Sequence, residues 1–160
     1  MATIFGSGGI GNAMREAAVM LIVRDGLILA ISRRKDKTKF GFPGGKCEPN
    51  ELPMSAAARE TLEETGVSVN GMIHIYSRVE PRDAPDGEDF KCHCYFALDW
   101  QGDPHNSEEG EVKWLSEYDL TNPPTSAFPD YNRKTLEVFK NRFSEVPLLQ
   151  VGVANAEEAK

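Results

Sequence analysis

GKCEPNELPMSAAARETLEETGV, residues 45–67, is the stretch of this 160-residue chain that decides its fold. Glu60, Glu63 and Glu64 stand at positions i, i+3 and i+4, so a helix brings all three carboxylates to one face. Like charges on one face repel each other unless a cation lies among them. Because a hard divalent cation prefers several carboxylate oxygens, the pattern indicates a metal site on a helix.

A solvated acidic face is the alternative for such a run, with Arg59 pairing at the surface. The residues upstream favour the metal site. Gly44 and Gly45 predict a tight turn in which the backbone can approach an ion. Glu51 follows six residues after Gly45, and Pro53 stands where the first turn of a helix accepts proline.

The spacing Gly-x5-Glu-x7-Arg-Glu-U-x-Glu-Glu-x-Gly-U, with U an aliphatic residue, resembles the signature box of the Nudix hydrolases. Every charged and glycine position of that 23-residue pattern is present, namely Gly45, Glu51, Arg59, Glu60, Glu63, Glu64 and Gly66. Thr61 departs from the pattern, because the family usually carries an aliphatic residue there. Threonine is half apolar, so we expect this departure to affect packing more than chemistry.

The resemblance implies a divalent cation, Mg²⁺ or Mn²⁺, as the cofactor. It also implies the ligands of that cation: Glu60 and Glu64 as the principal ones, with Glu63 alongside and the carbonyl of Gly45 contributing. Glu51 would support the metal shell from behind.

The resemblance further implies a catalytic set. Arg59 would hold and orient the carboxylates, and Glu63 would lie beside them. We expect Glu60 to act as the general base, since neighbouring charges raise the pKa of a carboxylate in such a cluster. Some family members use a residue on a distant loop instead, and Glu109 and Glu111 precede a strand expected at 112–115.

Three features bear on the substrate, because the box specifies diphosphate cleavage and leaves the leaving group open. Arg33 and Arg34 follow a predicted strand, and Lys46 lies in the box loop; these cations are candidate phosphate contacts, with a solvated basic turn as the alternative. FPDYN at 128–132 resembles the Phe-Pro-x-x-Asn of MutT-type enzymes, which hydrolyse oxidised guanine triphosphates. In those enzymes the Asn reads the purine edge, so Asn132 is a candidate base contact; an exposed Asn in a helix-initiating turn is the alternative.

The predicted reaction is therefore hydrolysis of a purine nucleoside triphosphate, oxidised ones such as 8-oxo-dGTP included, to the monophosphate and pyrophosphate. Pro81 lies close to where ADP-ribose-cleaving members carry a proline, so ADP-ribose or a nucleotide sugar is the alternative substrate. A nucleotide-binding sensor without turnover is an alternative of another class. Retention of every box carboxylate favours the enzyme.

Composition sets the broad class of the protein. A length of 160 residues suits one domain with a real core. The net charge of −7 and the isoelectric point of about 5.0 argue against non-specific nucleic-acid binding. No apolar run is long enough for a membrane span, the start lacks a secretory signal, and three cysteines suit a reducing cytoplasm. The sequence leaves the oligomeric state open, a homodimer included.

The hydrophobic pattern predicts an α/β domain. Apolar runs at 17–23 and 27–32, joined by Arg-Asp-Gly, indicate a hairpin, and further strands are expected at 72–79, 90–100 and 112–115. Helices are expected at 53–65, with Ala58 and Leu62 packing on a sheet, and at 131–143, with Asp130 as its cap.

We expect residues 1–14 to be a flexible leader, 15–145 the hydrolase domain and 146–160 a C-terminal tail. GSGGIG at 6–11 matches the dinucleotide-binding fingerprint, but the buried strand that this motif needs before it is missing. The expected fold is a mixed sheet flanked by helices, and the Nudix resemblance implies the same α/β/α sandwich.

Overall fold

Two β-sheets carry the described part of the chain, which is residues 14–80 and 89–144 of a computed structural model. The first sheet is mixed and has the strand order β5-β1-β7-β6. In it β1 (Arg15–Leu21) runs parallel to β7 (Phe90–Gln101), while β5 (Gly44–Lys46) and β6 (Ser68–Glu80) pair antiparallel with their neighbours. In the second, antiparallel sheet, β3 (Leu27–Ser32) pairs with β2 (Val23–Arg24), β4 (Phe40–Gly41) and β8 (Val112–Leu115).

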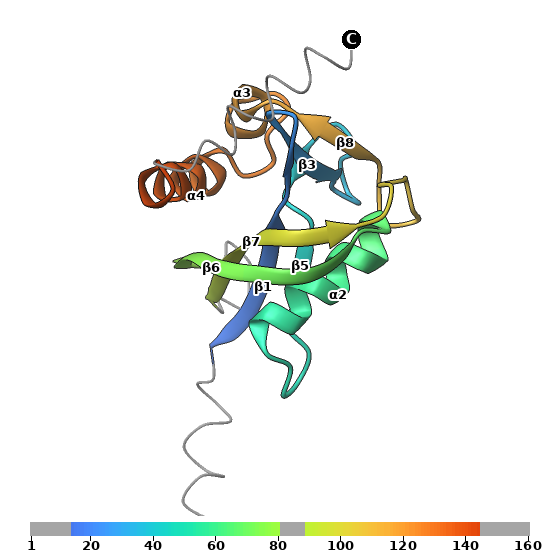
Figure 1. Ribbon diagram of the computed structural model, residues 1–160. Coiled ribbons are helices and arrows are strands. Elements are labelled where there is room, and N and C mark those ends of the chain that lie inside the picture. The colour runs from blue at the N-terminus through green and yellow to red at the C-terminus, as the bar shows by residue number, and fades with distance from the viewer. Residues whose placement is uncertain (1–13, 81–88, 145–160) are drawn as a thin grey trace, which may run out of the picture.

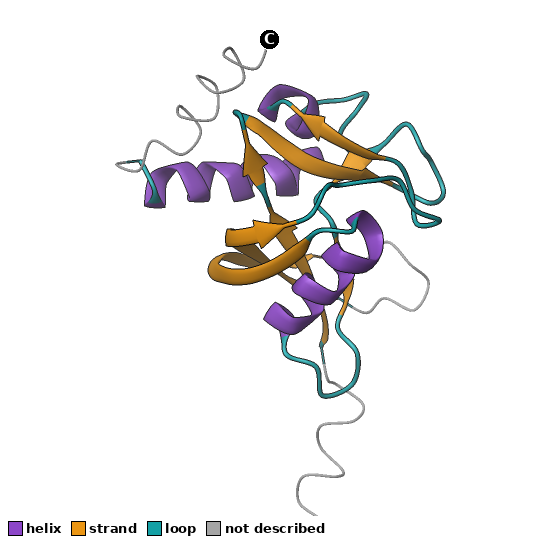
Figure 2. Ribbon diagram, turned by 45° about the vertical axis from the view of Figure 1, so that its right-hand side comes forward, coloured by secondary structure: helices purple, strands orange, loops and turns teal. Residues whose placement is uncertain are grey.

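Helices cover both faces of the first sheet, as Figures 1 and 2 show. Helix α2 (Pro53–Thr65) packs on one face, and α4 (Pro129–Arg142) lies on the other, with the short α3 (Glu117–Thr121) beside it. Two hydrophobic cores result. The core under α2 includes Ala18, Met20, Ala56 and Ala57, and the core under α4 includes Leu21, Phe96, Leu136 and Phe139. The expected α/β/α sandwich with a mixed sheet is confirmed.

The apolar run at 17–23 was expected to form one strand. It forms parts of two strands instead, because the chain passes from one sheet to the other at Ile22. β1 ends at Leu21 in the first sheet, and β2 begins at Val23 in the second. The predicted hairpin follows, with Asp25 and Gly26 at φ of 53° and 76°, the left-handed values that a tight two-residue turn requires. After the hairpin the chain continues as β3 in the second sheet, and Arg33 directly follows the last residue of β3.

Helix α2 begins at Pro53, as predicted, and Ala58 packs partly buried against the core as expected, but Leu62 does not. Leu62 is 52% exposed, whereas Ala57 and Thr61, one turn apart, are fully buried against the first sheet. The Thr61 hydroxyl donates to the carbonyl of Ala57 at 2.7 Å, which satisfies a polar group in the core. The departure from the family pattern at Thr61 therefore does affect packing, and the expected role of Leu62 is wrong because small residues face the sheet.

Helix α4 buries Leu136 and Phe139, as its periodicity predicts. Asp130 is not its cap. The cap position is Phe128, and the Asp130 carboxylate in the first turn instead meets Arg78 of β6 at 3.1 Å.

Several expectations fall on residues outside those described. They are the leader up to residue 13, the tail at 146–160, the fingerprint at 6–11 and Pro81. Within the two described ranges, none of the helices has the length and apolarity needed to cross a membrane.

Candidate active site

Arg59 organises the box residues from the middle of α2. Its guanidinium forms a two-pronged ion pair with Glu51, from Nε to Oε2 at 2.8 Å and from Nη2 to Oε1 at 2.9 Å. This pair holds the pKa of Glu51 at about 2, well below its ordinary value. Nη2 also donates to the carbonyl of Lys46 at 3.3 Å, so Arg59 ties the loop before α2 to the helix itself.

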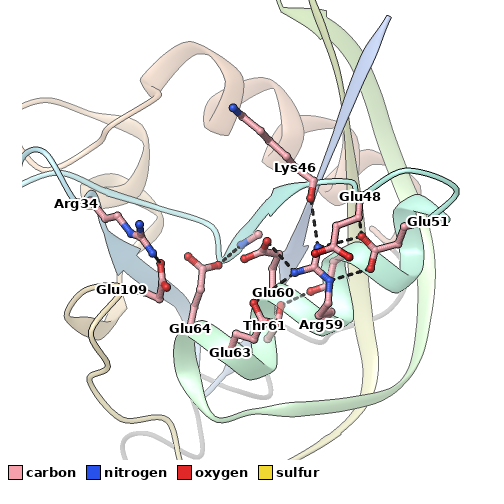
Figure 3. Close-up of polar contacts among 12 residues, drawn as sticks. Arg34, Lys46, Glu48, Glu51, Arg59, Glu60, Thr61, Glu63, Glu64 and Glu109 are labelled. Carbon is pink, nitrogen blue, oxygen red and sulfur yellow. Dashed lines mark hydrogen bonds and ion pairs between the residues drawn. The ribbon is translucent and has the colours of Figure 1, made fainter. Parts of the chain in front are cut away.

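The Glu60 carboxylate lies between Arg59 and Gly45 of β5 (Figure 3). Its Oε1 accepts from Nη1 of Arg59 at 3.1 Å, and the same nitrogen reaches Glu63 at 3.3 Å. Gly45 lies against the carboxylate, because a Cβ at that position would stand 2.7 Å from Cδ of Glu60. Burial raises the pKa of Glu60, and the charge of Arg59 opposes that rise.

Glu64 lies one helical turn further along the same face. Its Oε1 accepts a hydrogen bond of 2.7 Å from the backbone N–H of Gly44. Burial, together with the nearby charges of Glu60 and Glu109, nevertheless raises the pKa of Glu64 to about 8. Without a cation, Glu64 therefore holds its proton to higher pH than an ordinary glutamate does.

The loop before β8 brings a further carboxylate, that of Glu109, to the site. The Ser107 hydroxyl donates to the carbonyl of Glu64 at 3.0 Å, and the N–H of Glu109 donates to that hydroxyl at 3.2 Å. The loop is thus fastened to the C-terminal end of α2. Glu109 forms an ion pair with Arg34, so acidic and basic groups meet at the rim of the site (Figure 3).

Several of these groups line a cavity of about 330 Å³, together with residues of β3, β4 and β5. One part of its wall carries carboxylates, another carries consecutive cations after β3, and a third is apolar. Its lining residues are Ile31, Ser32, Arg33, Arg34, Lys35, Gly41, Phe42, Gly44, Glu60, Glu64, Glu109 and Phe128.

The cavity gathers some of the residues predicted from the sequence and leaves others out. Glu60, Glu64, Glu109, Arg33 and Arg34 line it. Glu51 and Glu63 are not part of its lining. Both form ion pairs with Arg59, and the Glu63 side chain is 55% exposed.

Two candidate residues do not reach the cavity. The Lys46 side chain points away from the carboxylates (Figure 3), and its ammonium lies 5.6 Å from the centre of the Phe90 ring. Lys46 contributes its carbonyl, and a phosphate contact from its ammonium is not supported. Glu111 pairs with Ser32 through its backbone, the N–H donating to Oγ at 2.8 Å, and its carboxylate does not line the cavity.

Asn132 is likewise absent from the cavity wall. It is 1% exposed, and its amide nitrogen donates to the carbonyl of Leu120 at 2.9 Å and to Oγ of Ser126 at 3.3 Å. The side chain therefore joins α4 to α3 and the intervening loop. The alternative of an exposed turn residue is wrong, because Asn132 is buried, and a contact of Asn132 with a purine stays a prediction.

Sequence reasoning missed Phe128 and the apolar part of the wall. Phe128 is 44% exposed and lines the cavity beside Gly41 and Phe42. The available signal was the first residue of the FPDYN segment, a large apolar side chain just outside a helix.

The donor set fits a hard divalent cation. Glu60 and Glu64 supply carboxylate oxygens to one cavity, where burial and, to a lesser extent, neighbouring carboxylates raise the pKa of both groups. Within the described residues, no three His, Cys, Asp or Glu side chains form a complete cage. Mg²⁺ commonly binds through one or two carboxylates and takes its remaining ligands from water and substrate phosphates, so a partial set of protein ligands suits it.

Comparison with known proteins gives the family. The family model described as "NUDIX domain" matches residues 14–138. The chain belongs to the Nudix hydrolases. It is therefore a pyrophosphohydrolase of the nucleotide-cleaving class, which confirms the family and the enzyme class predicted from the box.

The relatives of this Nudix hydrolase are MutT-like. A protein of Bacillus subtilis (strain 168), provisionally named an 8-oxo-dGTP diphosphatase, is 27% identical over 82% of this chain and 83% of its own length. The CTP pyrophosphohydrolase of Escherichia coli (strain K12) is 30% identical over 64% of this chain and 76% of its own. The crystal structure of a MutT NUDIX hydrolase from Burkholderia pseudomallei superposes with a TM-score of 0.63 at 30% identity, covering 77% of this chain and 95% of that one.

Proposed function

We propose that this Nudix hydrolase cleaves purine nucleoside triphosphates, those with oxidised bases included, to nucleoside monophosphate and pyrophosphate with Mg²⁺ or Mn²⁺ as its cofactor. The observation that carries the proposal is the composition of one cavity wall: the carboxylates Glu60 and Glu64 line the same cavity as Arg33 and Arg34. A divalent cation and arginine side chains together can bind the charged oxygens of a triphosphate. The names of the B. subtilis and E. coli relatives both concern nucleoside triphosphates, and the first of them concerns an oxidised purine one.

The size of the cavity favours a compact substrate. A volume of about 330 Å³ lies at the lower end for ligand pockets, which suits a single base and part of its phosphate chain. ADP-ribose carries a second sugar beyond the diphosphate and needs further wall. We therefore place the triphosphate first.

The residues divide the work as follows. Glu60 is the general base: its Oε1 accepts from Arg59, which leaves Oε2 to take the proton of the attacking water. Arg59, fixed by Glu51, sets the orientation of that carboxylate. Glu64 and the Gly45 carbonyl complete the cation's protein ligands. The cation, when bound, withdraws charge from the diphosphate oxygens and makes water more acidic.

Arg34 binds a phosphate oxygen in exchange for Glu109. In the substrate-free state these two side chains are paired at the rim of the cavity. A triphosphate offers Arg34 a stronger, two-pronged partner, and its arrival releases Glu109 toward the cation end of the cavity.

Product analysis tests the proposal. The protein is incubated with Mg²⁺ and, separately, dGTP, 8-oxo-dGTP, ATP and ADP-ribose, and the products are separated by ion-exchange chromatography. We expect nucleoside monophosphate and pyrophosphate from the purine triphosphates, with loss of activity in Glu60→Gln and full activity in the matched control Glu108→Gln on the exposed loop. AMP and ribose phosphate from ADP-ribose, with the triphosphates left intact, would overturn the proposed substrate.

A further inference from the structure

Four polar side chains form a continuous hydrogen-bonded row across the first sheet. The row joins Glu16 of β1, His93 of β7, and Ser77 and His74 of β6, three strands that lie side by side (Figure 1). Nε2 of His93 lies 3.0 Å from Oε1 of Glu16, and Nδ1 of the same ring lies 2.6 Å from Oγ of Ser77. Nε2 of His74 also lies 2.6 Å from that Oγ. The serine oxygen therefore has two imidazole nitrogens within hydrogen-bond distance.

The row lies on the face of the sheet that α2 covers in part. Side chains two residues apart in a strand share a face. Glu16 stands two residues before Ala18, and His93 stands two residues before Tyr95. Ala18 and Tyr95 both belong to the core under α2. Glu16 and His93 therefore continue that face along β1 and β7, beyond the apolar core.

A β-bulge in β6 brings the second histidine to the serine. Ser77 stands directly opposite His93 in the ladder of β6 and β7. His74 stands three residues before Ser77, a spacing that puts two side chains on opposite faces of a regular strand. The register shifts between His74 and Tyr76, which adds the residue needed to return both side chains to one face. The irregularity of the strand thus places His74 on the serine oxygen.

The carboxylate sets the direction of each hydrogen bond in the row when both rings are neutral. A carboxylate only accepts, so Nε2 of His93 carries the proton that points to Glu16. Nδ1 of His93 then accepts from the Ser77 hydroxyl, and the serine oxygen accepts from Nε2–H of His74. Burial lowers the pKa of His74, which favours its neutral ring. Ser77 therefore has a base on its proton and a donor on its oxygen, as an activated nucleophile requires.

Access to solvent differs along the row. His93 is 9% exposed, so its ring is shielded from water, whereas the Glu16 side chain is 40% exposed. Ser77 is half-buried and His74 is exposed, which opens the serine to a small reagent from the His74 side. The Tyr95 ring, centred 5.5 Å from that of His74, offers an aryl group an apolar contact nearby.

The row is separate from the cavity of the box residues. None of its four members lines the cavity that holds Glu60 and Glu64, and the proposed triphosphate cleavage does not use them. In residues 14–80 and 89–144, His, Cys, Asp and Glu side chains form no group of three that could hold a metal ion. What the row offers is a nucleophile with a base and an orienting carboxylate.

We propose that Ser77 is the nucleophile of a second, metal-independent site that hydrolyses small aryl esters through an acyl-serine. Oγ of Ser77 bonds to the carbonyl carbon while its proton passes to Nδ1 of His93, and Glu16 stabilises the imidazolium. The N–H of His74 turns to the carbonyl oxygen, where negative charge develops. The aryl C–O bond breaks, and the leaving oxygen takes the proton from His93. Water then attacks the acyl-serine with His93 as the base again, which releases the carboxylic acid.

Covalent labelling in EDTA tests the nucleophile without the box metal. Diisopropyl fluorophosphate bonds its phosphorus to an activated serine oxygen and releases fluoride, and peptide mass spectrometry locates the adduct. We expect Ser77 to react at least about 100-fold faster than Ser68, an exposed serine of the same strand, because a positioned base contributes at least that factor. His93→Gln should lower the labelling rate about 100-fold, and Glu16→Gln about tenfold or more.

Ester turnover tests the complete site. The release of nitrophenolate from p-nitrophenyl acetate is followed in EDTA, and we expect Ser77→Ala to lower kcat/KM at least about tenfold with an unchanged Tm. Cys47→Ser is the matched control, because a thiol can attack this ester directly and Cys47 packs near the same face of the sheet. It should keep the wild-type rate. Prior labelling of Ser77 should abolish the activity in proportion to the fraction labelled.

The outcomes leave a clear decision. Ser77 labelled no faster than Ser68, or equally fast in His93→Gln, overturns the proposal. Ester hydrolysis that is the same in Ser77→Ala as in wild type also overturns it, since imidazole or thiol groups then account for the rate. These results are independent of the proposed triphosphate cleavage, which is measured with Mg²⁺ and without the label.

Discussion

Replacing Glu64 by Gln should stabilise the cation-free protein while removing its activity. The glutamine Oε1 keeps the acceptor for the Gly44 N–H, so the change removes a charge and little else. The folded protein raises the pKa of Glu64 from 4.5 to about 8. A carboxyl group with a raised pKa contributes stability that is present below about pH 4.5 and is lost as the pH rises through about 8, because the unfolded chain ionises first.

The size of the effect follows from that shift. A difference of 3.5 pKa units (8 − 4.5) corresponds to an upper limit of about 5 kcal/mol at high pH. Water and structural relaxation around a partly accessible carboxylate reduce this, so we expect about 1–3 kcal/mol in favour of the Gln variant at pH 9. That free energy is a Tm difference of roughly 3–12 °C for a domain of this size.

The assay is thermal unfolding in EDTA at pH 5, 7 and 9. The advantage of Glu64→Gln over wild type should grow with pH, while the exposed control Glu108→Gln shows a constant, small difference. Saturating Mg²⁺ should then raise the Tm of wild type more than that of the Gln variant. A Gln variant that is less stable than wild type at pH 9, or a difference independent of pH, would refute the reasoning.

Three other substitutions test separate parts of the site. Gly45→Ala places a Cβ 2.7 Å from Cδ of Glu60, so displacement of that carboxylate should lower kcat/KM about 100-fold in steady-state assays; an active Ala variant would contradict the close contact. Arg59→Lys removes the two-pronged pair with Glu51 and should lower Mg²⁺ affinity about 10- to 100-fold by titration calorimetry, against unchanged affinity if the pair is only structural. Asn132→Ala removes buried donors and should lower the free energy of unfolding in urea by about 1–3 kcal/mol, with the KM for dGTP within about threefold of wild type; a large KM increase at unchanged stability would restore a base contact.

The box could be predicted because its chemistry is local. Glu60 and Glu64 are four residues apart on one helix, so their shared face follows from helical geometry alone. Glu51 and Arg59 belong to the same motif, but the ion pair between them was not predicted. Glu109 was only one of two options, because its place depends on how Ser107 fastens a distant loop to α2.

Other features depend on packing that the sequence pattern does not show. The apolar run through Ile22 reads as one strand, since hydrophobic periodicity does not reveal a change of sheet. Leu62 was placed in the core because it lies on the helix face opposite the carboxylates, but the residues that α2 buries fully include Ala57 and Thr61. Asn132 was judged by its residue type, and its burial depends on α3 and the loop after it.

The most direct test of the central claim is ³¹P NMR of dGTP hydrolysis by the wild-type protein, run with Mg²⁺ and again with excess EDTA. We expect signals of dGMP and pyrophosphate with Mg²⁺, and no hydrolysis once the cation is removed. Release of orthophosphate and dGDP, or hydrolysis that continues in EDTA, would contradict it.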